Sequence, residues 1–299
     1  MSMDLLISKI KAKNNPTVAG LDPVADYIPE YILEKHRKVF GHDIKAVIEA
    51  TYEFNTGLID ALCDIVPAVK PQSAYYEMLG YQGAKLLART IEYAKRKGLY
   101  VILDVKRNDI GSTAAAYAKG YFGNNGYGVE SVTVNPYLGT DGIAPFQQYC
   151  DEAEKSIFVL VKTSNPSSGE LQDLRLEEGL RVYEKMADMV TQWGSTSVGE
   201  FGYSNVGAVV GATYPAQLRA LRERCPHTFF LVPGYGAQGA GAAEIAGAFD
   251  DNGLGAVINS SRGIMCAWKK EKCAPEDYAK AARREAIRMR DEILGVLNR

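Results

Sequence analysis

The segment Tyr100-Val-Ile-Leu-Asp104-Val-Lys106-Arg-Asn-Asp109-Ile-Gly-Ser-Thr113 is the most informative part of this 299-residue chain. Its apolar first half is typical of a buried parallel strand that reaches the surface at its carboxyl end. Because side chains alternate along a strand, Asp104 and Lys106 lie on one face, and Asp109 follows three residues later. A surface ion pair contributes only about 0–1 kcal/mol, so stability alone is a poor reason to place two acids around one lysine.

Two structural explanations of these charges remain open at this point. Asp109 can cap a helix formed by the Ala-rich residues that follow it, and Asp104 with Lys106 can form a solvated strand edge. Neither explanation requires a functional site. The rest of the chain must show whether these charged residues have a structural or a functional role.

Short β-rich runs recur along the chain, each followed by a helical pattern of apolar residues. The eight predicted strands are 17–21, 66–71, 100–106, 131–136, 156–162, 206–211, 228–234 and 255–261. Helices are predicted near 44–62, 79–94, 141–153, 173–193, 214–225, 239–251 and 276–297. Eight alternating units of this kind predict an α/β protein with a closed (β/α)8 TIM barrel, and a doubly wound open sheet is the structural alternative.

No Pro/Ser-rich or low-complexity linker divides the sequence, so residues 1–299 are predicted to form a single barrel domain. Two longer connections, 23–43 and 164–205, depart from the regular pattern. They are candidate lids or dimer contacts, although a plain structural decoration is the simpler explanation of the first.

Composition argues against several classes of partner. The chain has 34 basic and 36 acidic residues, a net charge of −2 and no basic block, so it lacks the electrostatic footprint of a nucleic-acid-binding protein. It contains neither a signal-peptide core nor a run near the roughly 18 apolar residues of a membrane span. Its five scattered cysteines indicate reduced thiols rather than a disulfide framework or a zinc site. We therefore expect a cytoplasmic protein with no nucleic-acid or membrane partner.

Polar residues follow nearly every predicted strand. The carboxyl ends of barrel strands form the functional face of the (β/α)8 fold. The residues at these ends are Asp22, Lys70, the cluster Asp104, Lys106 and Asp109, Asn135, Thr163-Ser164-Asn165, Gln238 and Arg262. Convergence of seven such ends on one barrel mouth is hard to explain by solvation, so the sequence predicts a functional site there.

The seventh strand end, Gly234-Tyr-Gly236-Ala-Gln238-Gly239, matches the dinucleotide pattern Gly-x-Gly-x-x-Gly. That pattern normally opens the first βαβ unit and needs an acid after the next strand, whereas the next strand here ends near Arg262. In barrels a phosphate commonly binds between the seventh and eighth loops on backbone N–H groups. We therefore predict a phosphate site at Gly236, Gly239 and Arg262 in preference to an NADP site or a merely tight turn.

Six short motifs follow one another between about residues 17 and 263. They are Gly-Leu-Asp22-Pro, Val-Lys70-Pro-Gln, Asp104-x-Lys106-x-x-Asp109-Ile-Gly-Ser-Thr, Thr-Ser164-Asn-Pro, Pro-Gly-x-Gly236-Ala-Gln-Gly and Ser-Ser-Arg262-Gly. Jointly they resemble the orotidine 5′-phosphate decarboxylases of the longer bacterial type. Asn108 departs from the Gly expected before the last aspartate, which leaves the charged spacing intact and affects only loop geometry.

The resemblance implies a (β/α)8 homodimer that converts orotidine 5′-monophosphate to UMP with no cofactor and no metal. It implies that Lys106 donates a proton to C6 of the pyrimidine, with Asp104 and Lys70 completing an alternating chain of charges. Asp109, with Ile110 and Thr113, is implied to reach the neighbouring subunit's site. The other implied substrate contacts are Asp22 and Lys70 at the ribose hydroxyls, Ser164 and Gln238 at the pyrimidine and its approach to the phosphate, and Arg262 with the Gly236 and Gly239 backbone at the phosphate.

The chemistry of the reaction suits these residues. Loss of CO2 from C6 leaves a carbanion that no carbonyl is placed to delocalise, so a preorganised cation must stabilise it. Lys106 supplies that cation. The flanking carboxylates keep the ammonium protonated and face the substrate carboxylate with like charge, which disappears when CO2 leaves.

Two other functions remain open on the sequence. A related barrel with the same Asp-x-Lys-x-x-Asp motif processes sugar phosphates with Mg²⁺, and it would need acids after other strands, where Glu77 is the only nearby candidate. A barrel that binds a nucleotide phosphate without catalysis would be expected to have a broken charge cluster. Here the cluster is complete.

Overall fold

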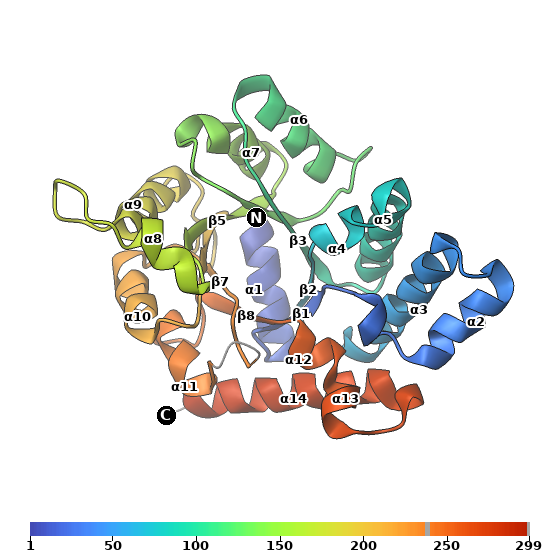
Figure 1. The fold of residues 1–299 in the computed structure, drawn as a ribbon. Coiled ribbons are helices and arrows are strands. Elements are labelled where there is room, and N and C mark those ends of the chain that lie inside the picture. The colour runs from blue at the N-terminus through green and yellow to red at the C-terminus, as the bar shows by residue number, and fades with distance from the viewer. Residues whose placement is uncertain (237–239, 298–299) are drawn as a thin grey trace.

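Eight parallel strands form a closed barrel in the computed structural model, which describes residues 1–236 and 240–297 (Figure 1). The strands are β1 Thr17–Leu21, β2 Ala68–Pro71, β3 Tyr100–Arg107, β4 Ser131–Val134, β5 Ser156–Lys162, β6 Val206–Val210, β7 Phe230–Val232 and β8 Ala256–Ser260. Consecutive strands pair in order, and β1 pairs with β8 to close the sheet. The predicted (β/α)8 barrel is confirmed, and the open-sheet alternative is wrong.

Helices surround this barrel (Figure 1). They are α1 Ser2–Lys13, α2 Glu30–Phe40, α3 Ile44–Leu62, α4 Ala74–Glu77, α5 Gly80–Arg96, α6 Gly111–Phe122, α7 Thr140–Glu152, α8 Gly169–Gln172, α9 Val182–Gly194, α10 Pro215–Arg224, α11 Ala242–Ile245, α12 Arg262–Met265, α13 Ala267–Glu271 and α14 Tyr278–Leu297. Short 3-10 turns are η1 Ala25–Tyr27, η2 Pro166–Ser168, η3 Ala246–Ala248 and η4 Pro275–Asp277. None of the helices among the described residues is long and apolar enough to cross a membrane.

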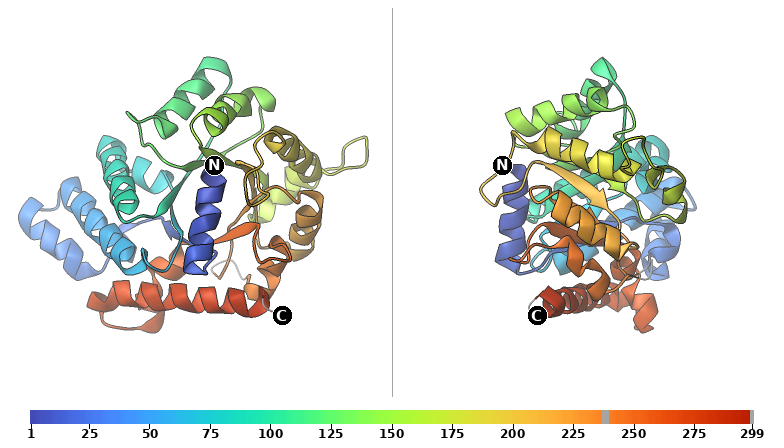
Figure 2. Two further views of the ribbon diagram at one scale, coloured as in Figure 1. Left: turned by 180° about the vertical axis from the view of Figure 1, so that it is seen from behind. Right: turned by 90° about the vertical axis from the view of Figure 1, so that its left-hand side faces the viewer.

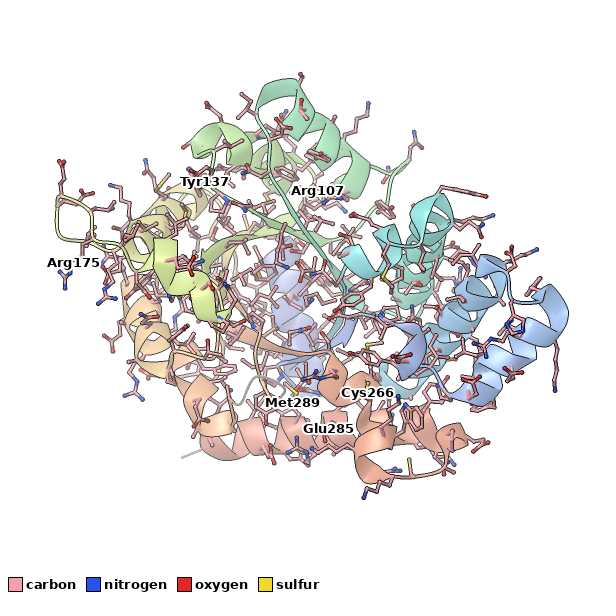
Figure 3. The ribbon with its side chains drawn as sticks, in the orientation of Figure 1. Arg107, Tyr137, Arg175, Cys266, Glu285 and Met289 are labelled. Atoms are coloured by element: carbon pink, nitrogen blue, oxygen red, sulfur yellow. The ribbon has the colours of Figure 1, made fainter. Side chains whose placement is uncertain are left out.

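Most predicted helices are confirmed, but two are shorter than predicted. The helix expected over 173–193 begins at Val182, because residues before it form a loop closed by an antiparallel bridge between Arg175 and Arg181. Arg175 stands on this loop where it projects from the molecule (Figure 3). Within 239–251, the described residues form the four-residue α11 and the turn η3, and Gly241 and Gly247 lie among these residues and disfavour helix.

The period-two pattern of each strand divides its side chains between two cores. On β3, Tyr100 and Ile102 face the inside of the barrel, whereas Val101 and Leu103 pack beneath the outer helices. This alternation places the next inward position, Asp104, directly above the apolar interior.

Helix α1 closes the amino-terminal end of the barrel, as the view from behind shows (Figure 2). Its buried residues Met3, Leu6, Ile7 and Ile10 pack against the inner side chains of the strands. Their helical spacing was visible in the sequence, although the helix was not predicted. The cavity that is lined by the predicted site residues lies at the opposite, carboxyl-terminal end.

Candidate active site

A cavity of about 580 Å³ lies at the carboxyl end of the barrel. Apolar residues Leu160, Val209 and Leu231 belong to its lining and to the inner core, so they form its floor. The polar lining residues come from the ends of most strands and are Asp22, Lys70, Gln72, Asp104, Lys106, Thr133, Thr163, Ser164, Asn165, Asn259, Ser261 and Arg262. Six predicted site residues, Asp22, Lys70, Asp104, Lys106, Ser164 and Arg262, are thereby brought around one space.

Asp104 holds two ammonium groups at the centre of this cavity. Lys70 Nζ donates to Asp104 Oδ2 at 2.8 Å, and Lys106 Nζ donates to Asp104 Oδ1 at 2.5 Å. Asp104 and Lys70 are 6% and 5% exposed, whereas the Lys106 side chain is 43% exposed and borders the open space. The explanation of Asp104 as part of a solvated strand edge is therefore wrong.

Lys70, Asp104 and Lys106 form an array of alternating charges, and its two buried members, Lys70 and Asp104, remain charged at neutral pH. Burial by itself would raise the pKa of Asp104, but the charges of Lys70 and Lys106 outweigh it and hold that pKa well below its usual range. Burial likewise acts to lower the pKa of Lys70, but Asp104 and Asp22 outweigh it and raise the pKa. The result is one carboxylate fixed between two ammonium groups.

The backbone is irregular where this array is formed. The register of β3 against β4 shifts between Leu103 and Arg107, and Lys106 has a left-handed φ of +46°. For a lysine this conformation costs about 1–2 kcal/mol. The Thr133 hydroxyl contacts the irregular segment, accepting from Val105 N at 3.0 Å and from Lys106 N at 2.9 Å. Sequence analysis missed Thr133, although a polar, inward-facing residue near the end of an apolar strand was a usable signal.

Asp109, Ile110 and Thr113 do not line the cavity of their own chain. Asp109 is half-buried, and its Oδ1 accepts from the Ile110 backbone N–H at 2.8 Å. Ile110 is 53% exposed and occupies the cap position of α6, so the alternative that Asp109 caps this helix is wrong. Thr113 is exposed on the first turn of α6.

At the predicted phosphate end, Arg262 opens α12 and borders two adjoining cavities. The second cavity, of about 490 Å³, is also lined by Gly236, which has a φ of +71° that a glycine adopts without strain. Arg262 and Gly236 thus lie near one another. Gln238 and Gly239 lie outside the described residues.

One wall of the cavity is formed by Thr163 and by Ser164 and Asn165 at the start of the 164–205 connection. Thr163 N donates to Gln172 Oε1 at 2.9 Å. Just before it, the fully buried Lys162 donates to Asp173 Oδ2 at 3.0 Å. This ion pair between a buried lysine and a partly exposed aspartate, which sequence analysis did not identify, fastens the connection to the end of β5.

Glu77, the acid considered for a magnesium site, forms an ion pair with Arg107 and does not line the cavity. Within residues 1–236 and 240–297, no group of three or more His, Cys, Asp or Glu side chains is arranged to hold a metal ion. The donor set required by the magnesium-dependent alternative is therefore not found in the described part of the chain.

Residues 50–275 match the model of the Orotidine 5′-phosphate decarboxylase / HUMPS family. The chain belongs to this family. It is 44% identical over 289 residues to the orotidine 5′-phosphate decarboxylase of Rhodopirellula baltica, covering 93% of this chain and 94% of the relative. It is 40% identical over 298 residues to that of Clostridium tetani, covering 100% and 99%. The predicted resemblance is confirmed.

Solved structures of the family agree with this assignment. The Leishmania donovani OMP decarboxylase superposes with a TM-score of 0.73 at 32% identity, covering 97% of this chain and 98% of that one. A Methanocaldococcus jannaschii orotidine 5′-monophosphate decarboxylase complexed with the inhibitor BMP has a TM-score of 0.61 at 16% identity, covering 90% and 97%. This second likeness shows the shared fold.

Proposed function

We propose that this chain decarboxylates orotidine 5′-monophosphate to UMP in pyrimidine nucleotide biosynthesis, with Lys106 as the proton donor. The proposal is supported by nearly full-length relatives named for this activity. The structural observation that carries it is the Lys70–Asp104–Lys106 array, which presents one partly exposed ammonium to a cavity with an apolar floor.

In the proposed reaction the C6–carboxylate bond of the pyrimidine breaks and its electron pair stays on C6. The substrate carboxylate lies beside Asp104, so like charges repel in the ground state and the repulsion ends when CO2 leaves. The Lys106 ammonium stabilises the carbanion electrostatically and then transfers a proton from Nζ to C6. Because the Lys106 side chain is 43% exposed, solvent can return the proton.

Other cavity residues would bind the parts of the substrate that do not react. Asp22 and Lys70 would bind the ribose hydroxyls, and Ser164 would contact the pyrimidine together with Gln238. Arg262, with the backbone at Gly236 and Gly239, would hold the phosphate. Gly236 and Arg262 line the second cavity, which shares Arg262 with the cavity that contains the Lys70–Asp104–Lys106 array. Binding energy from these remote contacts raises the rate when it is realised in the transition state.

We further propose a homodimer in which Asp109, Ile110 and Thr113 complete the partner's site. Large apolar side chains are exposed just after β2, β3 and β4, namely Met78 (59%), Tyr81 (85%), Ile110 (53%), Tyr137 (76%) and Leu138 (45%). Because these strands are neighbours in the barrel, the exposed residues gather on one side of its mouth, where Figure 3 shows Tyr137. A second copy would cover them. The cytoplasmic location and the single domain over 1–299 remain predictions of the sequence.

The decisive measurement is the loss of orotidine 5′-monophosphate absorbance with purified protein in the presence of EDTA, with UMP identified as the product. We expect full activity in EDTA and a loss of activity in Lys106→Ala. Turnover of a sugar phosphate that depends on added Mg²⁺ would favour the alternative enzyme. Binding of UMP without any turnover would favour a non-catalytic barrel.

A further inference from the structure

Strand β3 reaches Lys106 through a break in its pairing with β4. Leu103 pairs with Val132, and the next paired residues are Arg107 and Val134. Three residues of β3, 104–106, therefore lie opposite the single residue Thr133 of β4. Such a bulge leaves backbone N–H groups without their normal ladder partners.

The Thr133 hydroxyl supplies the missing partners. Its Oγ1 accepts from Val105 N at 3.0 Å and from Lys106 N at 2.9 Å. It also donates to Asp104 Oδ1 at 2.8 Å, the same oxygen that receives Lys106 Nζ. A hydroxyl has one proton and two lone pairs, so all of its hydrogen-bonding capacity is used. Thr133 is 1% exposed, which leaves water little access to take its place.

We propose that Thr133 is a positioning residue for the decarboxylation, whose hydroxyl fixes the left-handed backbone of Lys106 and the orientation of Asp104 before substrate binds. The inference rests on the proposed function. One side chain from β4 thus fixes the positions of both the proton donor, Lys106, and the carboxylate of Asp104 beside it. A catalytic array of this kind must be preorganised, because a misplacement of 1 Å can cost about 100-fold in rate.

Valine has nearly the shape of threonine but cannot form these three hydrogen bonds. In Thr133→Val, two amide groups and Asp104 Oδ1 each lose a partner, so the bulge is expected to rearrange and to displace Lys106 Nζ. Thr133→Ser retains the hydroxyl and loses one methyl group. We therefore expect activity to depend on the presence of the hydroxyl at position 133 and not on the volume of the side chain.

The test measures kcat and KM for orotidine 5′-monophosphate, and UMP affinity by calorimetry, in wild type and three variants. We expect kcat of Thr133→Val to fall about 100-fold, with KM and UMP affinity within about threefold of wild type. Thr133→Ser should recover most of kcat. The matched control is Thr17→Val, since Thr17 is also fully buried in a strand and its hydroxyl has no hydrogen-bond partner among the described residues.

Two results would overturn the inference: a Thr133→Val enzyme with wild-type kcat, or a Thr133→Ser enzyme as slow as Thr133→Val. If Thr133→Val does not fold, Thr133→Ser and Thr133→Ala decide the matter, because equal kcat values for these two would also overturn it. A wild-type protein that does not decarboxylate the substrate would refute the proposed function itself. An active wild type with a fully active valine variant would refute only the role of Thr133.

Discussion

Replacing Asp104 with Asn tests the electrostatic array most directly. In wild type, the Asp104 carboxylate binds Lys70 Nζ at 2.8 Å and Lys106 Nζ at 2.5 Å. The substitution replaces this carboxylate with a neutral amide, so the two ammonium groups lose their shared negative partner. A charge pair at 2.8 Å attracts by about 6 kcal/mol at an effective dielectric constant of about 20. Part of this attraction offsets the desolvation of both groups. Since removing one partner of a buried pair typically costs about 3–5 kcal/mol, we expect the free energy of unfolding to fall by that amount.

This loss of stability should shrink as the pH rises. In wild type, burial acts to lower the pKa of Lys70, but Asp104 and Asp22 outweigh it. In Asp104→Asn mainly the weaker attraction of Asp22 opposes burial, which is the largest single influence on this group, so we expect the pKa of Lys70 to fall below its usual 10.5. The folded variant then binds fewer protons than the unfolded chain, so its free energy of unfolding rises with pH between the two pKa values. Wild type, in which this pKa is raised, does not gain stability over that interval.

The assay is urea unfolding followed by circular dichroism at pH 7 and again at about pH 9.5. The control is Asp188→Asn, which removes a more exposed ion pair with Arg224 and should cost about 0–1 kcal/mol. A loss below about 1 kcal/mol in Asp104→Asn, or a loss that does not change with pH, would show that this carboxylate does not neutralise a buried ammonium.

Two further predictions concern the subunit interface and the cavity wall. Coexpressed Lys106→Ala and Asp109→Ala subunits, each inactive alone, should regain activity in mixed dimers because one site then has both groups; heterodimers that form without activity would contradict a shared site. Asp173→Asn should lower Tm and raise KM, because it leaves Lys162 buried without its carboxylate and loosens the wall formed by Ser164. The control Lys185→Met breaks an exposed pair in the same connection and should change neither quantity. An unchanged KM in Asp173→Asn would refute the anchoring role.

Much of the barrel was predictable because its signal is local. Each strand is a short β-rich run, and all eight observed strands begin and end within two residues of their predicted bounds. Helix α9 was predicted too long because the loop before it depends on a bridge between Arg175 and Arg181, which leaves no periodic signal. Helix α1 was not predicted because it precedes the first strand and so lies outside the βα repeat. Helix α2 was not predicted because it lies within the 23–43 connection, which was expected to be an irregular elaboration.

The amino-acid sequence alone determined the eight βα units and the cluster of Asp104 and Lys106, because period-two alternation and short sequence separation fix which side chains share one strand face. Only the tertiary structure decided which groups pair across strands: Lys70 with Asp104 through barrel closure, and Thr133 with the amide groups of Val105 and Lys106. The physical reason is that strand register and bulges are set by the neighbouring strand, and no local pattern in either segment records that pairing.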